Sequence, residues 1–141
     1  MSASPTPTAS AKNWRGTGVV LVVDDEDDIR HTAARLIAHF GFQVHEADSG
    51  PAALAYFHAG GAADLVLLDQ TMPDMDGLAT LTELRKLMPA LRVVLFSGFS
   101  EDDARHHFRG QDITRFLQKP FSLDMLRDTL RAAVGGTSER P

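Results

Sequence analysis

The chain has 141 residues, which is about the length of one globular domain. It contains no cysteine, so disulfide bonds and thiolate metal sites are excluded. Its longest purely apolar run, residues 19–23, is far short of the roughly 20 residues that a membrane-spanning helix needs, so no membrane association is expected. The net charge of −5 argues against nucleic acid as a direct partner.

The two ends of the chain differ in composition from the middle. Residues 1–17 are rich in Ser, Ala, Pro and Thr, which is typical of a disordered tail, and residues 135–141 indicate a flexible C-terminal tail. Trp14 is the exception, since it either packs on the edge of the domain or belongs to a linker. The first residues lack the apolar core of a secretory signal, which favours a cytoplasmic location. We expect one folded domain over 18–134.

Between the tails, apolar or β-branched runs alternate with segments whose apolar residues follow helical spacing. Ser100 and Ser122 are the expected N-caps of the last two helices, and Asp48 or Ser49 that of the second. In chain order, the pattern predicts a strand at 19–23, a helix at 29–40, a strand at 42–47, a helix at 51–59, a strand at 65–68, a helix at 77–88, a strand at 92–96, a helix at 101–109, a strand at 115–118 and a helix at 123–134.

Strict alternation of strands and helices indicates an α/β fold with a parallel sheet that is covered on both faces. Right-handed crossovers leave few topologies for five such units. We predict a doubly wound, five-stranded parallel sheet of order 2-1-3-4-5, the flavodoxin-like arrangement.

Polar side chains follow four of the predicted strands. Asp24 and Asp25 follow the first strand, Asp69 the third, Ser97 the fourth and Lys119 the fifth. Ligands bind at the carboxyl ends of the strands in open α/β sheets, and the predicted order places these four strands side by side. Taken singly, each of these residues has an ordinary structural explanation as a helix cap, a turn residue or a solvated surface side chain. Their convergence at one edge favours a site.

The charges of this site predict a bound cation. Three carboxylates and one lysine carry a net charge of −2, so the pocket repels itself unless a cation enters. A hard divalent ion with oxygen ligands, such as Mg²⁺, balances this charge. A metal, a carboxylate nucleophile, a lysine and a hydroxyl together are typical of a phosphoryl-transfer site.

Four motifs carry a resemblance to a known family. VLVVDDE, DLVLLDQTMPDMDG, VVLFSG and FLQKPF stand in order at residues 20–26, 64–77, 93–98 and 116–121. The sequence resembles the receiver domains of two-component response regulators over about 17–134. The segment WRGTG at 14–18 also resembles the linkers that precede receivers at the C-terminus of hybrid sensor histidine kinases.

The resemblance implies a role for each residue of the acidic site. Asp69 is the expected phosphoacceptor, which attacks the phosphorus of a phosphohistidine on a sensor histidine kinase or histidine phosphotransfer protein. Asp25 is expected to bind Mg²⁺ directly, and Asp24 to bind it through water. Asp69 and the backbone carbonyl of Thr71 complete the implied metal ligands.

The same resemblance implies a switch. Ser97 matches the switch hydroxyl, and Lys119 matches the lysine that pairs with the phosphoryl group, aimed by an expected cis peptide before Pro120. Phe116 stands where the family places an aromatic switch residue, often Tyr; the alternative is a plain core residue of the last strand. Phosphorylation is expected to change the surface made by 101–109, 115–118 and the last helix.

Two other functions are compatible with part of this pattern. A Mg²⁺-dependent phosphatase with an aspartyl nucleophile would resemble the haloacid-dehalogenase family. That family has Asp-x-Asp after its first strand and a cap insertion that encloses the substrate. The sequence here has adjacent Asp24 and Asp25 and no segment that resembles such a cap, so the phosphatase is disfavoured. A receiver-like interaction module that takes no phosphate is disfavoured by the complete acid pocket. As a receiver, the domain would catalyse its own phosphorylation and dephosphorylation. The cognate kinase, the downstream target and the oligomeric state are left open.

Overall fold

The computed structural model describes residues 14–72 and 75–135. Strands and helices alternate along the chain as the sequence predicts, and most boundaries agree within two residues. In chain order the elements are β1 (Val19–Val23), α2 (Asp27–His39), β2 (Gln43–Ala47), α3 (Gly50–His58), β3 (Leu65–Asp69), α4 (Gly77–Leu87), β4 (Arg92–Ser97), α5 (Glu101–His107), β5 (Arg115–Gln118) and α6 (Leu123–Gly135).

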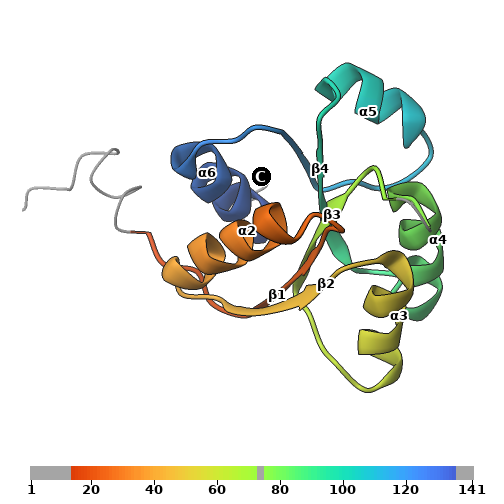
Figure 1. Ribbon diagram of the computed structural model, residues 1–141, viewed down its shortest axis with the longest axis horizontal. Coiled ribbons are helices and arrows are strands. Elements are labelled where there is room, and N and C mark those ends of the chain that lie inside the picture. The colour runs from red at the N-terminus through yellow and green to blue at the C-terminus, as the bar shows by residue number, and fades with distance from the viewer. Residues whose placement is uncertain (1–13, 73–74, 136–141) are drawn as a thin grey trace, which may run out of the picture.

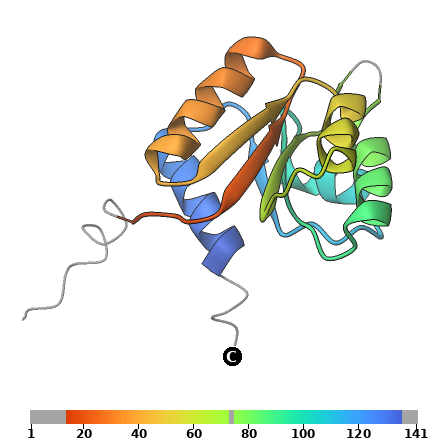
Figure 2. The same cartoon turned by 90° about the horizontal axis from the view of Figure 1, so that it is seen from below.

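The five strands form one parallel sheet of order β2-β1-β3-β4-β5, which confirms the predicted topology. Helices α2 and α6 cover one face of the sheet, and α3, α4 and α5 cover the other (Figures 1 and 2). Because all strands run in the same direction, their carboxyl ends meet at one edge.

The core consists of two layers of apolar side chains, one on each face of the sheet. Alternate residues of a strand point to opposite faces, so Val20 and Val22 pack with α2 and α6, whereas Leu21 and Val23 pack with α3, α4 and α5. Strand β3 is buried along its whole length, including its last residue, Asp69. Asp69, the expected phosphoacceptor, therefore lies at the end of a fully buried strand.

Local sequence explains where several helices begin. The Ser49 hydroxyl accepts a hydrogen bond from the Ala52 amide, so Ser49 caps α3, and Ser122 accepts one from Met125 at the start of α6. Helix α2 begins at Asp27, two residues earlier than predicted, because part of the acidic run forms its first turn, where carboxylates favour the helix dipole.

The segment before β1 packs on the edge of the domain. Trp14 lies against the rings of Phe40 and Phe42, with ring centroids 6.5 and 5.8 Å away. The Gly16 amide donates to the Phe40 carbonyl. Of the two interpretations of Trp14, the structure therefore supports packing on the domain edge. Most of the predicted N-terminal tail (1–13) and most of the C-terminal one (136–141) lie outside the described residues.

Candidate functional site

Three carboxylates meet at the carboxyl end of the sheet. Asp24 and Asp25 follow β1, and Asp69 is the last residue of β3. Each offers a carboxylate oxygen, and these three oxygens all lie within 4.8 Å of one another. Asp24 and Asp69 are buried, whereas Asp25 is half-buried. The pocket is thus open to solvent on the side of Asp25.

Lys119 brings a positive charge between two of these carboxylates. Its Nζ donates to Asp24 Oδ2 and to Asp69 Oδ1, each at 3.2 Å, and lies 3.5 Å from Glu26 Oε1. The peptide bond between Lys119 and Pro120 is cis, as predicted. The Lys119 ammonium also lies 4.6 Å from the centre of the Phe96 ring, a cation–π contact.

The pKa values reflect this crowding. Burial raises the pKa of Asp69 to about 7, and the neighbouring Asp24 charge adds to the rise, while Lys119 opposes it. Burial alone would lower the pKa of Lys119, but Asp69 and Asp24 more than offset this, so it lies above its usual value. Without a cation, Asp69 is therefore only partly ionised near neutral pH.

The donor set of the pocket fits a hard divalent cation. Every ligand atom it offers is a carboxylate oxygen, the donor that Mg²⁺ and Ca²⁺ prefer. A cation held there would also lower the pKa of Asp69, since a nearby positive charge favours the ionised carboxylate. The three aspartates expected to bind the metal therefore lie together, and a divalent cation would balance their negative charge.

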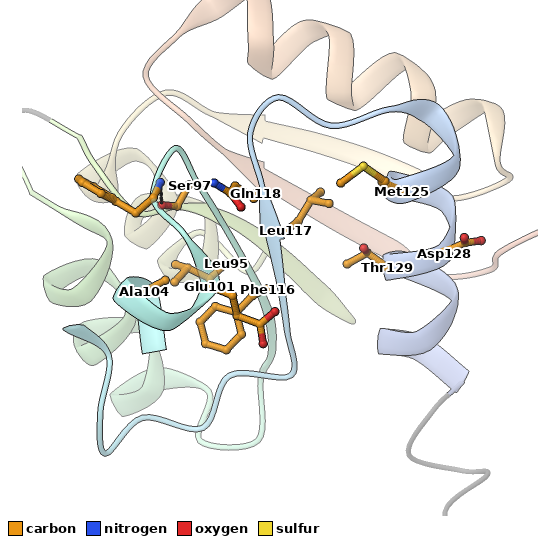
Figure 3. Close-up of a pocket in the computed structure, with 11 residues that line it drawn as sticks. Leu95, Ser97, Glu101, Ala104, Phe116, Leu117, Gln118, Met125, Asp128 and Thr129 are labelled. Atoms are coloured by element: carbon orange, nitrogen blue, oxygen red, sulfur yellow. Dashed lines mark hydrogen bonds between the residues drawn. The ribbon is translucent and has the colours of Figure 1, made fainter. Parts of the chain in front are cut away.

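Ser97 lies on the neighbouring strand, at the end of a groove between α5 and α6. This groove has a volume of about 390 Å³, and Figure 3 shows Ser97 beside Gln118, with Met125, Asp128 and Thr129 across it. The Ser97 hydroxyl accepts a hydrogen bond of 2.9 Å from the Phe99 amide. Its backbone carbonyl accepts one from the Lys119 amide, which joins the two residues at the sheet edge.

Phe116 lines the same groove beneath α5 (Figure 3). It is half-buried, and the guanidinium carbon of Arg105 lies 4.6 Å from the centre of its ring. Arg105 also forms an ion pair with Glu101 one helical turn away. Phe116 therefore packs against the core on one side and lines the groove on the other.

Comparison with protein families matches residues 20–131 to the response regulator receiver domain. The chain belongs to this family. It is therefore a receiver domain of two-component systems, which decides against the phosphatase interpretation. Receiver domains generally bind Mg²⁺ at an acidic pocket, and this receiver domain has such a pocket in Asp24, Asp25 and Asp69.

The receiver domain is similar to parts of longer proteins. It is 39% identical over 122 residues to the sensor kinase CckA of Brucella abortus, a match that covers 86% of this chain and 13% of CckA. It is 36% identical over 127 residues to the transcriptional regulatory protein ZraR of Salmonella typhimurium, covering 89% of this chain and 28% of ZraR. The chain thus spans less than a third of the length of these two curated relatives.

Solved structures show the same fold. The crystal structure of the receiver domain of NtrX from Brucella abortus is 33% identical in sequence and superposes with a TM-score of 0.73. The match covers 82% of this chain and 97% of the NtrX domain. Among the described residues, no helix of this receiver domain has the length and apolar character needed to cross a bilayer.

The structure brings together most of the residues that the sequence singled out. Asp24, Asp25, Asp69 and Lys119 form the pocket, and Ser97 lies on the next strand. Thr71 is exposed and lies two residues after Asp69.

Sequence reasoning missed three residues near this pocket. Glu26 lies beside Lys119, whereas Arg30 and Glu46 form an ion pair behind Asp24. The only local signal for Arg30 was its position three residues after Asp27, which places both on one helix face. Nothing in the local pattern pointed to Glu46.

Proposed function

We propose that this receiver domain accepts a phosphoryl group on Asp69 in a Mg²⁺-dependent reaction. The observation that carries the proposal is the position of the Asp69 carboxylate. It ends a buried strand, lies among two other carboxylates and receives a hydrogen bond from Lys119. This placement gives a nucleophile, a cation site and a fixed positive charge around one point.

Mg²⁺ would be held by Asp25, Asp69 and the backbone carbonyl of Thr71, with Asp24 acting through water. The half-buried position of Asp25 supports its direct role, because its carboxylate is accessible to an entering ion, whereas Asp24 is fully buried. When bound, Mg²⁺ supplies positive charge for the phosphoryl oxygens. Its charge would also favour the ionised form of the Asp69 carboxylate, which is the form that acts as a nucleophile.

The proposed transfer exchanges one bond to phosphorus for another. A carboxylate oxygen of Asp69 forms the new O–P bond while the N–P bond of the phosphohistidine breaks. The phosphohistidine reacts with its other ring nitrogen protonated, so when the leaving nitrogen takes the electron pair of the N–P bond, the imidazole departs neutral. Lys119, already 3.2 Å from Asp69 Oδ1, is placed to pair with a phosphoryl oxygen.

The proposed phosphodonor is a sensor histidine kinase or a histidine phosphotransfer protein. Support comes from the relatives, one of which is named a sensor kinase and another a transcriptional regulatory protein. The likeness to a sensor kinase agrees with the predicted origin in a hybrid kinase. The cytoplasmic location stays a prediction, as does the domain boundary at 18–134.

The proposed readout is a change in the surface of α5, β5 and α6. Ser97 and Phe116 line one groove, so a movement of the Ser97 side chain toward a phosphoryl group would change its shape. Helix α5 has seven residues and only Ala104 is buried within it, so little packing holds it in place.

Phosphorylation by a small phosphodonor tests the proposal. The protein is incubated with acetyl phosphate, with Mg²⁺ or with a chelator, and its intact mass is measured. We expect one added phosphoryl group only with Mg²⁺, and none in Asp69→Asn. Asp112→Asn is the matched control, because Asp112 is exposed and precedes β5 at the opposite end of the sheet. Equal phosphorylation of Asp69→Asn and wild type would overturn the proposal.

A further inference from the structure

Arg30 of α2 is a buried cation directly behind the acid pocket. Its guanidinium makes three contacts at once. Nη1 donates to the backbone carbonyl of Asp24 at 2.9 Å, Nε to Glu46 Oε1 at 2.9 Å, and Nη2 to Asp27 Oδ1 at 2.8 Å. The Arg30 side chain is 9% exposed. One side chain therefore connects the loop after β1, the first turn of α2 and strand β2.

The chemistry of arginine suits this position. The planar guanidinium presents several donors in a fixed fork, so it can satisfy a carbonyl and two carboxylates at the same time. A lysine ammonium is a compact point charge and would not reach all three. The two carboxylates offset the effect of burial and leave the pKa of Arg30 above its usual value. The guanidinium stays charged, and each of its three nitrogens has a partner.

The contact with Asp24 also fixes the next residue. The carbonyl of Asp24 and the amide of Asp25 belong to one planar peptide unit. A hydrogen bond that orients this carbonyl therefore orients the start of Asp25. A second hydrogen bond stabilises this loop after β1: the Glu26 amide donates to Asp24 Oδ1 at 2.8 Å.

We propose that Arg30 is a positioning residue of the phosphoacceptor site: its hydrogen bond to the Asp24 carbonyl sets the Asp25 carboxylate for the metal. The inference rests on the proposed function, because it assumes that the pocket binds Mg²⁺. Glu46 supports it by holding Arg30 from β2 at 2.9 Å.

The direction of the effect separates positioning from simple electrostatics. Arg30 is a positive charge near a site for a cation, so its charge alone weakens Mg²⁺ binding. Removing that charge would tighten binding if electrostatics were its only influence. Loss of positioning has the opposite sign, since a displaced Asp25 binds the metal less well. Groups that orient metal ligands change metal affinity by about 10-fold to 100-fold when removed.

The test compares Mg²⁺ affinity in matched variants by titration calorimetry. We expect Arg30→Met to bind Mg²⁺ at least about 10-fold more weakly than wild type, and Arg30→Lys to recover only part of the loss. The double variant Arg30→Met/Glu46→Gln removes both charges of the ion pair, and we expect it to bind Mg²⁺ as weakly as Arg30→Met does. Arg127→Met is the control, because Arg127 is a similarly buried arginine on α6 that pairs with Asp124 and Asp128.

A second readout needs no metal. Amide NMR spectra in the presence of a chelator should show shifted signals for Asp25 and Glu26 in Arg30→Met, and unshifted ones in Arg127→Met. If Arg30→Met does not fold, the same two measurements are made on Arg30→Lys, which keeps the charge.

The outcomes distinguish the two proposals. If wild type binds no Mg²⁺, the proposed function fails and the metal-positioning role of Arg30 fails with it; the metal-free amide signals then show only whether Arg30 orients the Asp24–Asp25 peptide. If wild type binds Mg²⁺ but Arg30→Met binds it equally well or more tightly, the positioning role is wrong and the proposed function stands. Unshifted Asp25 and Glu26 signals in the Arg30 variant would overturn the inference as well.

Discussion

The Lys119 ammonium lies 3.2 Å from the Asp69 carboxylate, although 50 residues separate them in the chain. The parallel sheet makes this contact possible, because it brings the ends of β3 and β5 to one edge. Burial and Asp24 nevertheless hold the pKa of Asp69 at about 7. The lysine therefore offsets only part of the repulsion within the pocket.

The raised pKa of Asp69 predicts a pH-dependent stability in the absence of metal. Between about pH 4 and about pH 7, the folded state keeps the proton of Asp69 while the unfolded state has lost it. The free energy of unfolding therefore falls as pH rises through this window, and the loss is complete above about pH 7.

Asp69→Asn should remove this loss, because asparagine carries no proton to release. We expect the variant to be more stable than wild type above about pH 7, by up to about 4 kcal/mol, with the difference fading toward about pH 4. Urea unfolding in a chelating buffer measures it, with Asp112→Asn as the control. A stability difference that does not change with pH would contradict the assigned pKa.

Mg²⁺ binding should depend unequally on the two residues after β1. Asp25→Asn removes a direct ligand and should weaken binding severely, whereas Asp24→Asn removes a carboxylate that acts through water and should weaken it less. Titration calorimetry of the two variants gives the comparison. Equal Mg²⁺ affinity in wild type and Asp25→Asn would refute the direct role of Asp25.

Ser97→Ala should separate phosphorylation from its readout. The variant keeps the Asp69 pocket, so it should still accept a phosphoryl group, but it lacks the hydroxyl that would move toward that group. Amide NMR with and without beryllofluoride measures the response. In wild type we expect shifts across α5 and β5, and in Ser97→Ala fewer of them.

The same spectra can contradict the switch. If the wild-type shifts stay in the loops around Asp24 and Asp69 while 100–118 is unchanged, the groove does not read out phosphorylation. The domain would then pass the phosphoryl group onward without a change in this surface.

Much of the fold was predictable because its signals are local. Apolar runs and helical spacing mark the elements. The alternation with right-handed crossovers leaves few strand orders, and the flavodoxin-like order is the one that five such units suit. The positions of Asp24, Asp69 and Lys119 followed from that order, because residues at strand ends meet at one edge.

The contacts around the pocket were not predictable in the same way. The pair of Arg30 and Glu46 depends on how α2 packs over β2, which no local pattern specifies. The hydrogen bond from the Phe99 amide to Ser97 depends on the turn after β4. Ser49 rather than Asp48 caps α3 for a similar reason, since both side chains have the required chemistry and only the backbone path selects one.

Mapping the phosphorylated residue tests directly whether Asp69 is the phosphoacceptor. The protein is phosphorylated with acetyl phosphate and Mg²⁺, treated with borohydride to reduce the acyl phosphate, and digested for peptide mass analysis. We expect reduction to convert Asp69, and no other aspartate, to homoserine, and only when Mg²⁺ was present. Modification at Asp24 or Asp25 instead, or at Asp69 to the same extent with a chelator, would contradict it.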